Sequence, residues 1–200
     1  WDHSTPLTIG EHGGHWYLCP QNASMYEGMG VYTDSEVCCH AVALKEKLFL
    51  EYARRMDVTG ISSFNIAHYF AVSMPDRDIP LPPVDREGRW GVYPKLIRKY
   101  SMTIGNGILE KYGYPRYKPN PAYPLIAEAM RPVTAILREY DQAFYEGRAF
   151  IRTFDIYHDV QSRVSLRLEV ECVQEKRSVC RTAFCLDMDP AGHEVRTVEV

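Results

Sequence analysis

The sequence lacks a long hydrophobic run, a strong net charge and a recognisable catalytic motif. No apolar stretch approaches the roughly 20 residues that a helix needs to cross a bilayer, so we expect no transmembrane segment. The 23 basic and 26 acidic residues give a formal net charge of −3, whereas nucleic-acid-binding domains carry a basic patch or stripe. We therefore expect no nucleic-acid partner. The expected partners are other protein subunits, and a membrane-associated complex is compatible with this prediction.

Cysteine is also scarce for a disulfide-based fold. The six cysteines of the 200-residue chain are Cys19, Cys38, Cys39, Cys172, Cys180 and Cys185. This density lies far below that of a disulfide scaffold, and the adjacent pair Cys38–Cys39 is awkward for a framework of bridges. We expect reduced thiols. The opposing signal is Asn22-Ala23-Ser24, a glycosylation sequon, which makes a secreted glycoprotein the runner-up.

The N-terminal stretch shows no sustained apolar period. Residues 1–33 are rich in Gly, His, Ser and Thr, and fixing such a backbone costs about 1–2 kcal/mol per residue. We expect an irregular arm that another subunit holds in place. The chain begins at Trp1 and not at methionine; together with this arm, that start favours a processed organellar protein, with a mitochondrial location preferred.

One strong helix is predicted after this arm. It begins near Asp34 and ends near Arg55, with Thr33 and Glu36 at capping-box spacing. Apolar side chains at three- and four-residue intervals mark the expected buried face. Those side chains are Val37, Ala41, Leu44, Leu48 and Tyr52.

Three further helices are expected before residue 147. They cover Ser63–Ser73, Trp90–Tyr112 and Pro124–Glu146, the last with a kink at Pro132. Two connectors rich in proline or tyrosine separate them, at 74–90 and 112–123. Stretches of this composition are typical of extended connectors on the surface or on a neighbouring chain.

The last fifty residues change to the period of two that is typical of strands. Apolar residues alternate with polar ones from Val164 to Cys172, and a turn at Glu175-Lys176-Arg177 predicts a hairpin. In that hairpin Cys172 faces Cys180 and Leu166 faces Leu186. Further strands are expected at 148–158 and 193–200, giving an antiparallel meander.

The predicted fold class is therefore α+β, with about four helices followed by a C-terminal antiparallel β-meander. We expect one domain over residues 34–200. The order of helices followed by a curved sheet is similar to that of the nuclear-transport-factor-2-like cone, a likeness of fold that implies no function by itself.

A histidine and cysteine group near the N-terminus suggests two kinds of chemistry. His12, His15 and Cys19, followed by Cys38, Cys39 and His40, contain the nitrogen and sulfur ligands that structural zinc takes. Alternatively, they are surface histidines and buried thiols, which we favour. His15 with Asp34 and Cys38 or Cys39 is a candidate nucleophile triad, and Gly14-His15-Trp16 resembles a string in ubiquitin-like-protein proteases. However, His40 follows Cys39 where that family has glycine.

Two candidate groups of residues lie in the predicted strands. Asp155, His158 and Asp159 contain the groups for acid–base catalysis. Because Asp155 and His158 are three residues apart, a strand points them to opposite faces, and we favour a solvated strand end. Cys172 and Cys180 are the candidates for a cross-strand disulfide, although reduced packing is favoured.

These features predict a non-catalytic accessory or structural subunit of a large organellar protein assembly. Mild acidity favours a protein-only setting such as a respiratory or ATP-synthase complex over ribosomal RNA, and 14 tyrosines suit subunit interfaces. No catalytic, cofactor-binding or metal-binding residue is assigned. The alternative function is a small-molecule-binding or acid–base enzyme with a pocket between the sheet and the helices.

Overall fold

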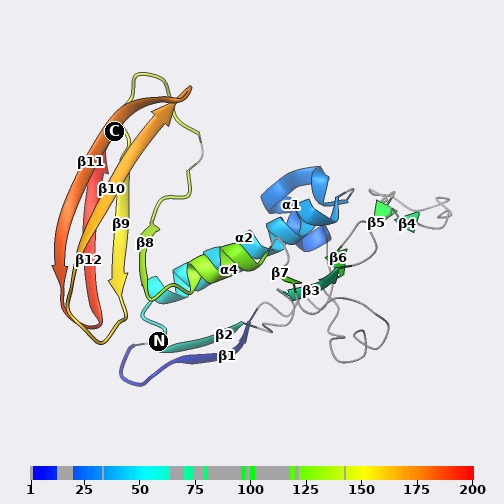
Figure 1. Ribbon diagram of the computed structural model, residues 1–200, viewed down its shortest axis with the longest axis horizontal. Helices are drawn as coiled ribbons and strands as arrows, with labels where there is room; N and C mark the ends of the chain where they lie inside the picture. Colours follow the sequence, from blue (N-terminus) through cyan, green and yellow to red (C-terminus); the bar gives the residue numbers. More distant parts are fainter. Residues whose placement is uncertain are drawn as a thin grey trace. The chain divides into compact units, whose positions relative to one another are not determined.

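The computed structural model describes five stretches of the chain and several short strands. The stretches are 2–12, 20–32, 34–63, 122–141 and 143–200, and the short strands lie between residues 70 and 119. The chain divides into two compact units, residues 1–130 and 131–200 (Figure 1). The sequence alone suggested a boundary after residue 33.

The first unit combines helices with short strands. Its described elements are β1 (Thr8–His12), α1 (Pro20–Glu27), the 3₁₀ helix η1 (Gly28–Tyr32), α2 (Ser35–Arg55), β2 (Gly60–Ser63), β3 (Phe70–Ser73), β4 (Ile79–Pro80), β5 (Leu96–Ile97), β6 (Tyr100–Ser101), β7 (Lys118–Pro119) and α4 (Tyr123–Ala129). Strands β1 and β2 pair in parallel, with Thr8 opposite Gly60. Helix α2 packs against both α1 and α4, so it is the central helix of this unit.

Helix α2 confirms the strongest helix prediction, but its cap and buried face differ. The N-cap is Asp34, whose carboxylate accepts a hydrogen bond from the Glu36 backbone N–H at 2.8 Å; Thr33 lies outside the described residues. The predicted face is confirmed only in part, because Ala41 is buried whereas Tyr52 is 51% exposed. The other buried side chains of α2 were not on the predicted face, and they include one acid: Cys38, Cys39, Val42, Ala43, Glu46, Leu50 and Ala53.

The expectation of an irregular arm over residues 1–33 was wrong. Strand β1, helix α1 and helix η1 all lie within it. The regular structure is stabilised locally, since Val31 belongs to a buried cluster with Cys38, Cys39, Ala41 and Val42 of α2. A short strand expected at Trp16–Leu18 lies outside the described residues.

The three other helix predictions were wrong in whole or in part. Strands β2 and β3 stand at both ends of the expected 63–73 helix, and β5 and β6 lie within the expected 90–112 helix. The expected 124–146 helix ends at Ala129, and residues 133–137 form a strand. Pro132 therefore follows a helix end and does not kink a helix, because the β-branched Val133 and Thr134 favour a strand. The connectors at 74–90 and 112–123 lie almost entirely outside the described residues.

The second unit is built from strands alone. These are β8 (Val133–Leu137), β9 (Ile151–His158), β10 (Val164–Gln174), β11 (Arg177–Met188) and β12 (Gly192–Glu199). Strand β9 lies between β8 and β12 in an antiparallel sheet, while β10 and β11 form a separate two-stranded sheet. Together with the helices of the first unit, this makes the chain α+β.

The residue pairs predicted for the hairpin are confirmed, although Arg177, which was expected in the turn, begins β11. In the structure Cys172 faces Cys180, Val170 faces Thr182, and Leu166 faces Leu186. The turn is Glu175-Lys176, where both residues adopt positive φ values of 48° and 67°. Such values suit the tight turn of a two-residue hairpin, whose twist matches that of the flanking strands.

The simple meander, in contrast, was wrong, because β9 pairs with β12 and β8 but not with β10. The hairpin instead packs its apolar side against β9, so that the unit has two layers (Figure 1). The side chains in this core are Ile156, Leu186 and Met188, with Phe154, Val164, Leu166, Leu168 and Phe184 around them. Alternation along β9 points Asp155 and Tyr157 to the other face of the three-stranded sheet.

Candidate functional site

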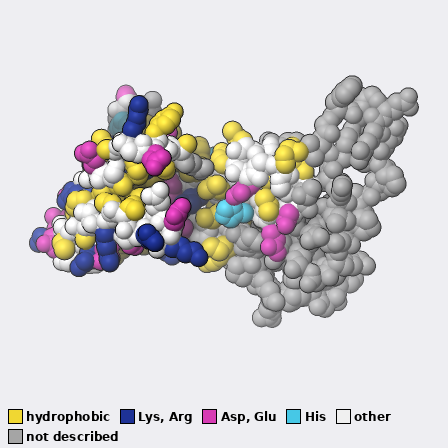
Figure 2. Space-filling model, turned by 90° about the horizontal axis from the view of Figure 1, so that it is seen from above, with side chains coloured by type: hydrophobic (Ala, Val, Ile, Leu, Met, Phe, Trp, Pro, Cys, Tyr) yellow, Lys and Arg dark blue, Asp and Glu magenta, His cyan; other side chains and the backbone are white. Residues whose placement is uncertain are grey.

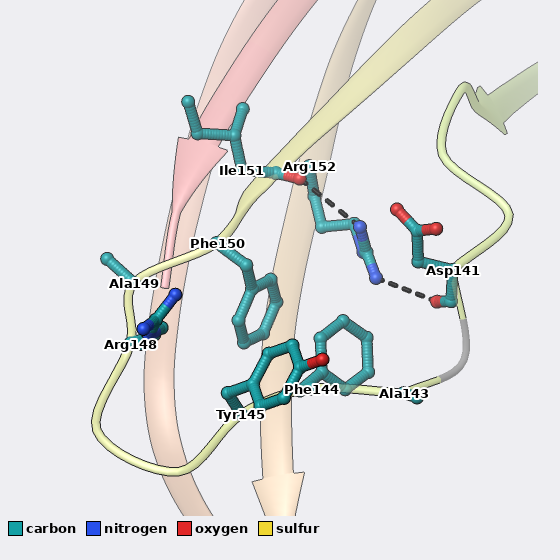
Figure 3. A pocket seen from close by; sticks show the side chains of 9 residues that line it. All are labelled: Asp141, Ala143, Phe144, Tyr145, Arg148, Ala149, Phe150, Ile151 and Arg152. Atoms are coloured by element: carbon teal, nitrogen blue, oxygen red, sulfur yellow. Dashed lines mark hydrogen bonds between the residues drawn. The ribbon is translucent and has the colours of Figure 1, made fainter.

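A groove lined by aromatic and arginine side chains lies where the chain enters β9. Its volume is about 370 Å³, and it is lined by Asp141, Ala143, Phe144, Tyr145, Arg148, Ala149, Phe150, Ile151 and Arg152 (Figure 3). Phe144 is 51% exposed and Tyr145 is 79% exposed, so the groove is open to solvent. Large aromatic side chains are seldom so exposed, because burying one removes roughly 150–250 Å² of surface area from contact with water.

The rings and guanidinium groups of the groove contact one another. Phe144 and Phe150 lie 4.4 Å apart between ring centroids, at 31°. The Arg152 guanidinium lies 4.7 Å from the centroid of Phe144 and 5.1 Å from that of Phe150. Arg148 lies 5.6 Å from the centroid of Tyr145. These are cation–π distances, so each arginine helps to hold an aromatic face in place.

Backbone hydrogen bonds tie the groove to the sheet. Phe150 and Val200 exchange backbone bonds of 2.9 and 3.0 Å, which extends the β9–β12 ladder. Arg152 donates from Nη2 to the Asp141 carbonyl at 2.9 Å and from Nη1 to the Ile151 carbonyl at 3.3 Å (Figure 3). The position of the Arg152 guanidinium is thus fixed by the chain itself.

The groove has an excess of positive charge. Arg148 and Arg152 face a single acidic lining residue, Asp141. Among the residues that the structure describes, neither arginine lies within 4.0 Å of a carboxylate oxygen to form an ion pair. On the face seen in Figure 2, acidic and basic side chains are interspersed among hydrophobic ones.

A second polar group surrounds Asp155 on β9. The carboxylate of Asp155 is 1% exposed and accepts two hydrogen bonds of 2.7 Å from Arg138. It also lies 2.8 Å from His193 Nε2 on β12. The Arg138 hydrogen bonds, the first among several causes, hold the pKa of Asp155 below its ordinary value. The His193 ring stacks on Tyr157, with centroids 4.4 Å apart.

The predicted acid–base candidates are separated by the strand. Asp155 pairs with Arg138 and His193, whereas His158 is 0% exposed and hydrogen-bonds the Ser162 carbonyl. The expected solvated strand end was therefore wrong for Asp155 and His158, although Asp159 is exposed. The prediction that Asp155 and His158 do not pair directly is confirmed. Sequence reasoning missed Arg138 and His193, which lie 17 and 38 residues from Asp155.

The N-terminal histidines have separate carboxylate partners. His12 Nδ1 lies 2.9 Å from Glu46, and its ring stacks on Phe49 at 3.4 Å. His40 Nδ1 lies 2.7 Å from Glu27. Within the described ranges no group of three side chains is placed to hold a metal ion. His15 and Cys19 lie outside these ranges, so the zinc and triad hypotheses remain untested there.

The Cys39 thiol of α2 is unsuited to act as a nucleophile at neutral pH. Cys38 and Cys39 are both buried. Burial, the largest cause, raises the pKa of Cys39 to about 12, which keeps the thiol protonated, whereas the thiolate is the reactive form. Cys172 and Cys180 face each other across the hairpin as free thiols.

The groove was missed in the sequence, although its residues carried a signal. Residues 140–152 include Tyr140, Phe144, Tyr145 and Phe150, interleaved with arginines. The same residues were assigned to the end of a helix and the start of a strand, and Tyr140 and Phe144 were placed on the apolar stripe of that helix.

Comparison with known proteins supplies no family for this chain. No family model, curated protein or solved structure matches it. In the part of the chain that the structure describes, no helix has the length and apolar character needed to cross a membrane.

Proposed function

We propose that this chain is a non-catalytic accessory subunit of a larger protein assembly and that it docks through the groove at residues 141–152. The observation that carries the proposal is the exposure of Phe144 and Tyr145 beside two arginines. Exposed apolar patches mark interaction sites, and tyrosine and arginine are enriched among the residues that dominate binding energy at interfaces.

The hydrogen bonds that hold the walls of the groove favour the same function. The Phe150–Val200 backbone bonds and the bonds from Arg152 hold its walls without a partner. A surface that is already ordered loses less conformational entropy on binding, which raises affinity for a given area. We expect the other subunit to bury the Tyr145 side chain.

An acid–base enzyme is the second candidate, and the Asp155–His193 pair is the observation that favours it. The carboxylate orients the His193 ring, which remains partly exposed. Against this function, Arg138 already neutralises Asp155, and none of these residues lines the groove. The mitochondrial setting remains a prediction that fractionation of cells tests.

Co-purification from the cells that encode the protein tests the proposed function. We expect tagged wild-type chain to retain a stoichiometric protein partner through washing, and Tyr145→Ala to lose it, since removing such a contact weakens binding by about 30-fold. Chemical cross-links from the retained partner should fall on residues 141–152.

The matched control is Tyr52→Ala, which removes another exposed tyrosine, 51% against 79% for Tyr145, on α2 and outside the groove. This variant should keep the partner at the wild-type level. Recovery of wild-type chain without any stoichiometric partner would refute the proposal. So would retention of the partner by Tyr145→Ala.

A further inference from the structure

We infer that the groove recognises an acidic, partly apolar peptide segment of the partner protein, an inference that rests on the proposed function. In this interaction a glutamate or aspartate side chain of the partner bonds Arg148 and Arg152. An adjacent aromatic or aliphatic side chain of the same segment packs on Phe144 and Tyr145. The occupant is thus a short stretch of polypeptide that combines both kinds of side chain.

The state of the arginines supports an anionic occupant. A guanidinium that stacks on a ring uses its flat face and leaves its N–H groups directed outward in the ring plane. Arg152 commits two nitrogen atoms to backbone carbonyls. Within the described residues the Arg148 side chain donates no hydrogen bond and forms no ion pair. Arg148 is also exposed to solvent. Carboxylates are the peptide groups that match this donor geometry.

The apolar wall supports a second recognition element beside the carboxylate. Phe144 and Phe150 form one ring pair, and Tyr145 lies beside them (Figure 3). The volume of about 370 Å³ lies at the small end of the range for ligand sites. The groove therefore fits a few side chains of an extended segment and not a folded domain.

Asp141 distinguishes this occupant from a cationic one. A lysine or methylated amine bound among the rings would use the Asp141 carboxylate as its counter-charge. An anionic occupant is repelled by the same carboxylate. Because Arg152 bonds the backbone carbonyl of Asp141, replacing the side chain by the isosteric amide leaves that bond in place.

Peptide binding to the 200-residue chain tests the inference by fluorescence anisotropy. The probe is a fluorescein-labelled heptapeptide of glycine and serine around a central Glu-Phe-Glu, and matched peptides carry Gln-Phe-Gln or Lys-Phe-Lys. We expect saturable binding of the glutamate peptide, about 5-fold weaker for Arg148→Gln and about 3-fold tighter for Asp141→Asn. Arg163→Gln, which changes an exposed arginine outside the groove, should bind as wild type does.

Three results would overturn the inference. They are absence of saturable binding to the glutamate peptide, equal binding of the glutamine peptide, and weaker binding by Asp141→Asn. The co-purified partner separates this failure from failure of the proposed function. If Tyr145→Ala releases the partner but Arg148→Gln does not, the groove is an interface and its acidic specificity is wrong. If neither variant releases the partner, the proposed function itself fails.

Discussion

The Asp155 carboxylate shows how one buried charge depends on residues far away in the sequence. Arg138, the residue directly after β8, and His193 on β12 reach it from the two sides of β9. A buried carboxylate is stable only when charged or polar groups replace the water that it has lost. The three side chains therefore fasten the three strands to one another on the face opposite the hairpin.

Asp155→Asn should destabilise the second unit at pH 7. The amide loses the bidentate ion pair and leaves Arg138 and His193 to find water, which both can do because they are partly exposed. We expect a loss of about 1–3 kcal/mol in the free energy of unfolding, measured by denaturant unfolding followed by circular dichroism. Asp189→Asn is the control, since the Arg163–Asp189 pair is exposed and should change stability by less than about 0.5 kcal/mol.

The pH dependence of this difference follows from the pKa of Asp155, which is held below its ordinary value of 3.8. A carboxyl with a depressed pKa in the folded state contributes stability above the unfolded pKa and loses it as pH falls toward the folded one. The difference in the free energy of unfolding between wild type and Asp155→Asn should thus be largest near pH 6 and decrease below about pH 4. A gap that stays constant to pH 2 would mean that charge is not involved.

Sequence reasoning found Asp155 and His158 but not their surroundings. Their spacing of three residues correctly predicted that they lie on opposite faces of the strand, because alternation depends only on positions along that strand. The burial of both residues and the partners of Asp155 depend on the pairing of β9 with β8 and β12. Arg138 and His193 lie 17 and 38 residues from Asp155. Contacts over such separations leave no local pattern in the sequence, so they could not be predicted.

Among the elements, the hairpin was predictable because two independent signals agree on one register. Alternation in β10 and β11 sets which face is apolar, and the turn sets the alignment. The 124–146 helix failed because a helical stripe of apolar residues was given more weight than Pro132 and the β-branched residues after it. Helix α2 was found, yet its buried face was only partly predicted, because Ala43, Glu46 and Ala53 also lie inward.

Lys176→Gly should stabilise the hairpin. Lys176 has φ of 67°, a region that costs a side-chain-bearing residue about 1–2 kcal/mol but is accessible to glycine. Because glycine also gains freedom in the unfolded chain, we expect a net increase of about 0.5–1 kcal/mol in the free energy of unfolding. Denaturant titration measures it.

Arg177→Gly is the matched control for this change, because Arg177 begins the regular strand β11 and pairs with Gln174. Glycine there should lower stability by about 0.5–1 kcal/mol. Equal effects of the two substitutions would show that the positive φ at position 176 carries no strain.

At the scale of the whole molecule, the α+β class was predictable from the change of period near residue 150, but the division at residue 130 was not. The first unit has its own buried clusters around α2, and the second has a separate core between its two layers. The groove lies within the second unit. Its aromatic residues were hidden from sequence reasoning because exposed and buried rings look alike in composition.

Hydrogen exchange on the native complex, compared with the isolated chain, tests most directly whether the groove is the docking surface. In the isolated chain, residues 143–147 donate no backbone hydrogen bond in the described structure, so their amides should exchange rapidly. Binding of the partner should slow these amides at least about 10-fold and leave the hairpin turn at Glu175-Lys176 unchanged. Unchanged exchange over 143–152, with protection elsewhere in the chain, would contradict a docking function for this groove.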